Sequence, residues 1–215
     1  TVVGDEAGTA LTTGDNNVAV GFEALKTEDA HGQNVAVGYR ALKTLNAAGD
    51  AHNTAVGNLA GEDVTTATAN TLIGSLSGMS LTTGGSNTAL GYNSLEVDTA
   101  GSRTVAIGFN ALQAQNFSSA TDSHNTAVGY NAGLSVTTGI QNVLIGARTG
   151  DALTDADFNV AVGQFALSSD TQGSKSTAIG EQALSTQNFS SATDTHNTAV
   201  GFKAGLSVTT GQFNT

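Results

Sequence analysis

Three of the four histidines share one context that could hold a metal. His52, His124 and His196 each stand two residues after an aspartate and directly before an asparagine. In a trimer, equivalent imidazoles from three copies would converge on the axis. The alternative is that the aspartate fixes a turn and leaves the histidine exposed. One such histidine in about 72 residues is not the spacing of a metal site within a chain, so we favour the turn and expect no metal.

Aromatic side chains offer a second kind of chemistry, because exposed rings can stack on sugars. Six of them directly follow a glycine that an aliphatic residue precedes: Phe22, Tyr39, Tyr92, Phe109, Tyr130 and Phe202. Packing at a corner or between subunits is the alternative, and we favour it. Phe117 and Phe189 lie in two copies of the stretch "NFSSATD". We expect Phe117, Phe189, Tyr39, Tyr92 and Tyr130 to be the candidates for contact with a partner at the surface.

The acidic residues do not form a recurring pair that could act as acid and base. Glu23, Glu28, Glu62, Glu96 and Glu181 are scattered, and the chain has no nucleophile elbow, P-loop or zinc motif. A catalytic site is one asymmetric constellation, whereas this sequence repeats itself throughout. We therefore expect no enzyme activity and no cofactor.

The composition narrows the possible partners. The 215 residues include 27 Gly, no Pro, no Cys and only 12% charged residues, with a net charge of −11. Binding to nucleic acid needs Lys and Arg on the phosphates, and the chain has only seven of them. No apolar run approaches the ~20 residues that a membrane span requires. We expect no nucleic acid partner and no membrane insertion.

Internal repeats organise the whole chain. Twelve units carry an aliphatic residue followed by a glycine, and these glycines stand mostly seventeen positions apart, as Gly4, Gly21 and Gly38 do. Four positions after this glycine, two units with Leu alternate with two units with Gly. The stretch from Gln115 to Gly139 recurs from Gln187 to Gly211 with only three substitutions. The true repeat is therefore a block of four units, and we expect residues 1–215 to be a single segment of a longer array.

Each unit predicts one short strand. The apolar run is four or five residues long, rich in Val, Ile and Thr, and bounded by Asn and Gly. A unit of this length suits one coil of a parallel β-solenoid, in which Val56, Ile73, Leu90 and Ile107 fall in one column. With strands about 4.8 Å apart, twelve coils make a rod about 58 Å long. The fold class is all-β.

The repeated positions have expected structural roles. Because side chains alternate along a strand, the aliphatic residue and the Thr or Val two before it share one face, while Ala faces the other way. We expect Val, Thr and Ala to form a thin core, and the extra residues of the long units to bulge outward. The corner glycines are Gly21, Gly38, Gly57, Gly74, Gly91, Gly108, Gly129, Gly146, Gly163, Gly180 and Gly201. The asparagines expected to form a ladder are Asn17, Asn34, Asn53, Asn70, Asn87, Asn125, Asn142, Asn159 and Asn197, with Thr104 and Ser176 in two units.

Units such as "NVAVGFEAL", "NTAVGYNAG" and "STAIGEQAL" resemble two groups of repeat proteins over essentially the whole chain. One is the head of trimeric autotransporter adhesins of the YadA type, and the other is the "NTAVGxxAL…TTG" repeat of phage tail-fibre-like proteins. The resemblance implies a homotrimeric β-roll that binds a host surface. The coils of the YadA-type head are typically shorter than the units of this chain, so the longer period favours the phage-fibre type.

These observations predict a shaft or receptor-binding segment of a trimeric attachment fibre, on a virion tail or at a cell surface. A thin core that buries little apolar surface favours association along the rod. A host cell-surface glycan or protein is the possible external partner. The alternatives are a solenoid that binds a glycan or ice, the latter suggested by Thr-Thr pairs such as Thr82-Thr83, and a subunit of an extracellular filament.

Overall fold

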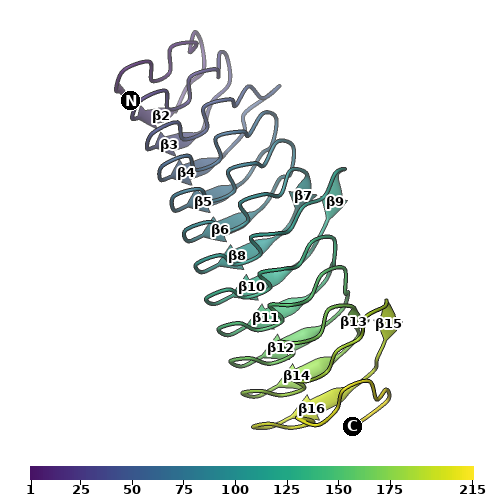
Figure 1. The fold of residues 1–215 in the computed structure, drawn as a ribbon. Helices are drawn as coiled ribbons and strands as arrows, with labels where there is room; N and C mark the ends of the chain where they lie inside the picture. Colours follow the sequence, from purple (N-terminus) through teal and green to yellow (C-terminus); the bar gives the residue numbers. More distant parts are fainter.

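The chain winds into a rod of stacked coils. The structure is a computed structural model that describes residues 1–215, and it contains strands but no helix. The two termini lie at opposite ends of the rod (Figure 1). We number the coils 1 to 12 by their corner glycines, from Gly4 to Gly201. The predicted all-β solenoid is confirmed, and the chain offers no helix with the length and apolar character to cross a membrane.

One strand from each coil joins a single parallel sheet of twelve strands along the rod. Val56 pairs with Ile73, Ile73 with Leu90 and Leu90 with Ile107, so the predicted column is confirmed. The strands are β1 (Val2–Val3), β2 (Val18–Val20), β3 (Val35–Val37), β4 (Thr54–Val56), β5 (Thr71–Ile73), β6 (Thr88–Leu90), β8 (Val105–Ile107), β10 (Thr126–Val128), β11 (Val143–Ile145), β12 (Val160–Val162), β14 (Thr177–Ile179) and β16 (Thr198–Val200).

Two small sheets mark the places where the long coils carry extra residues. β7 (Gly101–Ser102) pairs with β9 (Thr121–Asp122), and β13 (Gly173–Ser174) pairs with β15 (Thr193–Asp194). Figure 1 shows both pairs projecting at the edge of the coils that lies away from the main sheet. They form two ridges, four coils apart, and the extra residues stand out from the rod as the sequence predicts.

The inside of the coil is built differently from our expectation. The middle residue of each strand, usually Ala, is buried, whereas the Thr or Val before it and the aliphatic residue after it are half-buried or exposed. Alternation was predicted correctly, but the assignment of faces was wrong for Val and Thr. The cross-section of one coil is small. At most of these inward positions only a small side chain fits, and the larger β-branched residues point outward.

Corner glycines let neighbouring coils approach closely. All twelve have φ between 129° and 145°, a region that L-residues rarely adopt. A Cβ built on Gly91 would lie 2.4 Å from the carbonyl oxygen of Gly108 in the next coil. The residue at this corner must therefore be glycine for steric reasons as well as for its backbone conformation.

Alternation of Leu and Gly four residues after the corner is explained by volume exchange. The leucines and the glycines at this position share a left-handed backbone, with φ between 49° and 63°. Where coil 4 has Gly61 and coil 5 has Gly78, the strand of coil 5 carries buried Leu72 in place of Ala. A Cβ on either glycine would lie 2.7 Å from a methyl carbon of Leu72. Leu144 does the same between coils 8 and 9, so one leucine fills the space that two glycines leave.

A ladder of buried asparagines runs along the rod. The side-chain oxygen of Asn53 accepts a hydrogen bond from the backbone N–H of Asn70 at 2.9 Å, and its amide donates to the carbonyl of Ala67 at 2.8 Å. The Asn70 side chain continues the pattern to Asn87 at 2.9 Å. Each rung thus links a side chain to the backbone of the next coil and satisfies groups that water cannot reach.

Candidate functional site

The outer face of the main sheet is a uniform surface that follows the whole rod. Two ranks of side chains point outward from the strands, one of Thr or Val and the other of Val, Ile or Leu, and neither rank contains a charged residue. Leu90 is 45% exposed and Ile145 is 39% exposed. Most of these side chains are β-branched and stiff at χ1, so the face is regular, and its Val, Ile and Leu rank is apolar throughout.

A column of aromatic rings borders this face, directly after the corner glycines. The rings of Tyr92 and Phe109 stack at 5.3 Å between centroids, and those of Phe109 and Tyr130 at 5.6 Å. Phe22 and Tyr39 form a second stack at 5.5 Å. All five are exposed. Because the stacked rings cover one another's faces, the interior of each stack presents ring edges to a partner, and a sugar that stacks needs a face.

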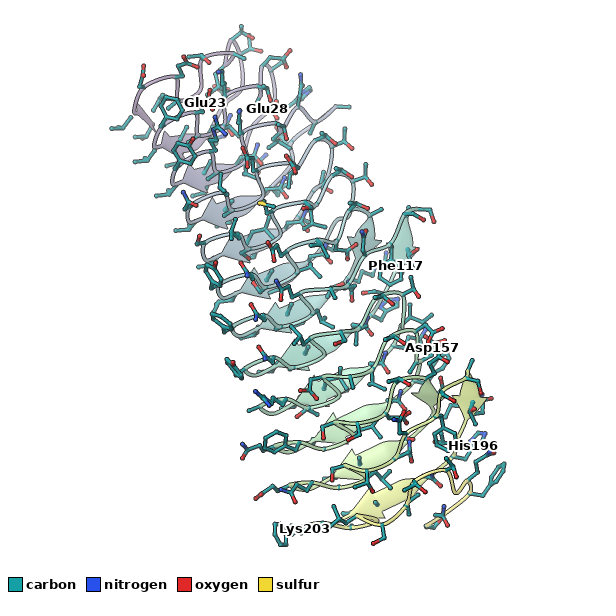
Figure 2. The ribbon with its side chains drawn as sticks, viewed as in Figure 1. Glu23, Glu28, Phe117, Asp157, His196 and Lys203 are labelled. Atoms are coloured by element: carbon teal, nitrogen blue, oxygen red, sulfur yellow. The ribbon has the colours of Figure 1, made fainter.

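Phe117 and Phe189 are not surface residues, which corrects our expectation. Each is only 6% exposed and points inward at the base of a ridge, while the serines and alanine that follow it are exposed. Figure 2 shows Phe117 at the ridge edge of the coils. The extra residues bulge outward, but the phenylalanine near their start points inward, because burial of its apolar ring is favourable.

His52, His124 and His196 lie exposed on the ridge side, with φ between 50° and 53°. Figure 2 shows His196 at this edge, with Lys203 at the opposite edge. In the first copy the preceding aspartate, Asp50, accepts hydrogen bonds from the N–H of Gly32 at 2.9 Å and from Gln33 at 2.6 Å. The Gly32 N–H and the Gln33 amide lower the pKa of Asp50. The aspartate thus holds the turn, and the structure does not bring the three histidines together within one chain.

A different group of acidic side chains and a histidine does lie close together. The ligand atoms of Glu28, Asp29 and His31 are within 4.8 Å of one another. The buried Glu28 carboxylate already accepts hydrogen bonds from the backbone N–H groups of His31 at 3.2 Å and Ala47 at 3.4 Å. Its oxygens are therefore engaged by the backbone. The turn that these hydrogen bonds hold explains why the three side chains lie close together, without a metal ion.

Sequence reasoning missed a buried polar network beneath each ridge. One oxygen of Asp98 accepts from the N–H of Gly101 at 3.0 Å and of Phe117 at 3.2 Å, and the other accepts from the Gln115 amide at 2.6 Å. The Gln115 oxygen in turn accepts from Asn125 at 2.8 Å. All of these groups are buried. The carboxylate therefore captures the backbone at the point where the extra residues begin.

The same network recurs in the next block of four coils. Asp170 accepts from Gly173 at 3.0 Å, from Phe189 at 3.0 Å and from Gln187 at 2.6 Å. Glu28 plays this role in the first block, where the longer coil has two extra residues. A signal was present in the sequence, because these three acids all stand seven residues after a corner glycine, in the coil before a long one. Thr104 and Ser176 replace the ladder asparagine where the glutamine needs room, and both accept a hydrogen bond from it.

One charge cluster lies near the N-terminal end of the rod. The carboxylate of Glu23 is 2.7 Å from the Lys26 ammonium, 2.8 Å from the Arg40 guanidinium and 3.1 Å from the Lys43 ammonium. The hydrogen bond from Lys26 is the main cause that lowers the pKa of Glu23 to about 2. These side chains come from coils 2 and 3, so the cluster ties neighbouring coils together on the side opposite the ridges (Figure 2).

Comparison of the chain with family models, with curated proteins and with solved structures finds no match. The surfaces described above therefore provide the basis for a functional conclusion.

Proposed function

We propose that this chain is a structural segment of a homotrimeric attachment fibre, in which three rods pack through the outer faces of their sheets. The observation that supports this proposal is the uncharged outer face, with one rank of aliphatic side chains and one rank of Thr or Val, which continues through all twelve coils. Its side chains repeat at the spacing of the strands, so a second copy in parallel register meets the same residues at every coil.

The contrast between this face and the rest of the surface supports the proposal. The chain has a net charge of −11, yet its charged side chains lie elsewhere on the coil. A rank of partly exposed aliphatic side chains that runs the length of the molecule is uncommon on a protein that remains alone in water. Copies that pack face to face would bury the two ranks together with the edges of the aromatic stacks, and would leave the acidic sides toward solvent.

The number three and the attachment role come from the resemblance of the repeat to adhesin heads and tail fibres. The geometry is compatible with a stiff spacer, because each coil repeats the hydrogen bonds of the one before. Adding a block of four coils lengthens the rod by about 19 Å and extends the same outer sheet face. The mechanism is mechanical: the segment holds a distal binding tip away from the particle that carries it.

Light scattering in dilute solution tests the assembly. Each chain has a mass of 21.4 kDa, and we expect three times this mass for the wild-type segment. Ile107→Lys with Ile145→Lys places charges on the outer face, and should yield a monomer with an unchanged far-UV spectrum. Thr66→Lys with Thr138→Lys is the matched control, because these threonines are exposed outside this face. A wild-type mass of one chain would overturn the proposal.

Deletion of residues 58–129 tests the spacer role. The deletion removes one block of four coils and joins Gly57 to Tyr130 in phase. A spacer should stay trimeric and become shorter by about 19 Å in electron micrographs. A fibre carrying the shortened segment should still attach to its host. Loss of attachment with an intact trimer would show that the deleted coils bind the host directly.

A further inference from the structure

Three patches with the same backbone conformation recur every four coils on the turn side of the rod. By the turn side we mean the side opposite the ridges, where the chain turns after each corner glycine. Each patch is formed by side chains that follow the corner glycines of two adjacent coils. In coils 2 and 3 the patch is the charge cluster around Glu23. In coils 6 and 7 the Gln113 amide donates a hydrogen bond to the Glu96 carboxylate at 2.7 Å, across the two coils. In both patches, long side chains close the surface by pairing with one another.

The third patch, in coils 10 and 11, is open instead. A hollow of about 310 Å³ is lined by Phe165, Ser168, Ser169, Gln182, Ser185 and Thr186. Glu96 and Gln113 of the second patch correspond to Ser168 and Ser185 here, so the side chains that would bridge the coils are cut short. The hydrogen bonds of the chain do not engage the hydroxyls of Ser168, Ser169 and Ser185 or the amide of Gln182.

Phe165 supplies a ring at one wall of this hollow. The Arg148 guanidinium, from the preceding coil, lies over one face of the ring, 6.0 Å from its centroid. Gln182, Ser185 and Thr186 belong to the following coil, so these lining residues and Arg148 come from coils on opposite sides of the coil that carries Phe165. Phe165 lines the hollow without an aromatic stacking partner, unlike Tyr92, Phe109 and Tyr130 beside the sheet, which stack on one another.

We infer that this hollow binds one neutral sugar ring. Hydroxyl and amide groups both donate and accept hydrogen bonds, which matches the hydroxyls of a sugar, and an aromatic face suits its C–H groups. An apolar ligand would leave the serines unpaired. No lining residue is charged, and the net charge of −11 disfavours an acidic sugar. A volume near 310 Å³ lies at the small end of ligand sites and fits a single ring.

The hollow is independent of the proposed trimer, because it lies on the turn side of the coils and not among the two ranks of the outer sheet face. For function, the hollow would provide one weak sugar-binding site on each rod. The hollow is shallow, so we expect a dissociation constant on the order of 1 mM, equivalent to about −4 kcal/mol. Three copies in one fibre would raise the effective affinity for a surface dense in sugars.

Saturation-transfer NMR with free glucose, galactose, mannose and N-acetylglucosamine tests the site. We expect transfer to the ring protons of at least one sugar from the wild-type chain. Phe165→Asn should abolish it, and this change suits the backbone because Asn93 and Asn110 occupy the same left-handed position in other coils. Ser168→Glu with Ser185→Gln copies the closed second patch and should abolish transfer as well.

Folding of both variants is checked by their melting temperatures, which should stay within a few degrees of the wild-type value. Absence of transfer from all four sugars would overturn the inference, as would transfer that both variants retain. Neither result bears on the mass of the assembly. Grafting the open patch onto coils 6 and 7 should roughly double the number of sites, through the changes Asn93→Phe, Glu96→Ser, Val97→Ser, Asn110→Gln, Gln113→Ser and Ala114→Thr.

Discussion

The inner and outer sides of the same strands follow different rules. Inward, the middle residue is Ala in nine of twelve coils and is Leu in the two coils that pair with glycines. Outward, Val, Ile and Leu alternate freely, as do aromatic and polar residues beside them. The inner side must fit the fixed volume of a small ring, whereas the outer side must only remain apolar and regular. The constant residue type inside therefore reports the fold, whereas the uncharged outer side is the surface on which the proposed trimer depends.

The sharpest test of this comparison is at the corner. In Gly108→Ala, the new Cβ would lie 2.3 Å from the carbonyl oxygen of Gly129, and the φ of 136° would be strained. We expect a loss on the order of 3 kcal/mol or more in the free energy of unfolding, measured by chemical denaturation. Gly49→Ala is the control, because nothing lies within 4 Å of its Cβ. Equal stability of the two variants would contradict the close-approach argument.

Removing the buried acid beneath a ridge should have the next largest effect. Asp98→Ala leaves the N–H groups of Gly101 and Phe117 and the amide of Gln115 without their acceptor. We expect a loss of about 2–4 kcal/mol and faster proteolysis of residues 116–122. Asp122→Ala removes an exposed acid that pairs with Arg103 and should cost less than about 1 kcal/mol. A similar loss in both variants would show that the network does not anchor the ridge.

Truncation of a leucine compares the inner and outer sides directly. Leu72→Ala empties the space between Gly61 and Gly78, and we expect a loss of about 2–5 kcal/mol in a thermal or denaturant scan. Leu90→Ala, on the next strand but pointing outward, should cost the monomer about 1 kcal/mol or less. If the outer change destabilised the isolated chain as strongly as the inner one, the outer side would be part of the core.

The smallest effect should come from acid on the charge cluster. The pKa of Glu23 is lowered from 4.5 to about 2, so its contribution to stability is complete above pH 4.5 and is lost as the pH falls through about 2. Amide exchange in coils 1–3 should therefore accelerate across this pH range more than in coils 8–10. Glu23→Gln should remove the difference, and a difference that persists would have to come from other acids.

Sequence reasoning found the coils because their signal is periodic, and it missed features that depend on direction. The spacing of the glycines determined the number of coils and the column through Val56, Ile73 and Leu90. Alternation shows which residues share a face but not which face is inside. The near-constancy of Ala was the available signal, since the coil leaves room for a larger residue there only beside the paired glycines, as at Leu72 and Leu144.

The candidate surfaces were harder to predict than the fold. Phe117 looks like an exposed loop aromatic until Asp98, in the preceding coil, is seen to hold its backbone N–H. The open patch around Phe165 is recognised only by comparison with its two closed equivalents, because serines in a polar stretch carry no signal of their own. Both features depend on contacts between neighbouring coils, which a one-dimensional pattern does not give.

The backbone hydrogen bonds of this rod point along its length, from each coil to the next, as in the 2.8 Å bond from the N–H of Gly38 to the carbonyl of Val20. A force that pulls the two ends apart would act on these hydrogen bonds in series, so the least stable coil would separate first. A freed coil can extend to roughly 60 Å of chain, where it had occupied about 4.8 Å of the axis. The rod can therefore extend as single coils unfold, and a fibre made of it would lengthen under shear before its attachment failed.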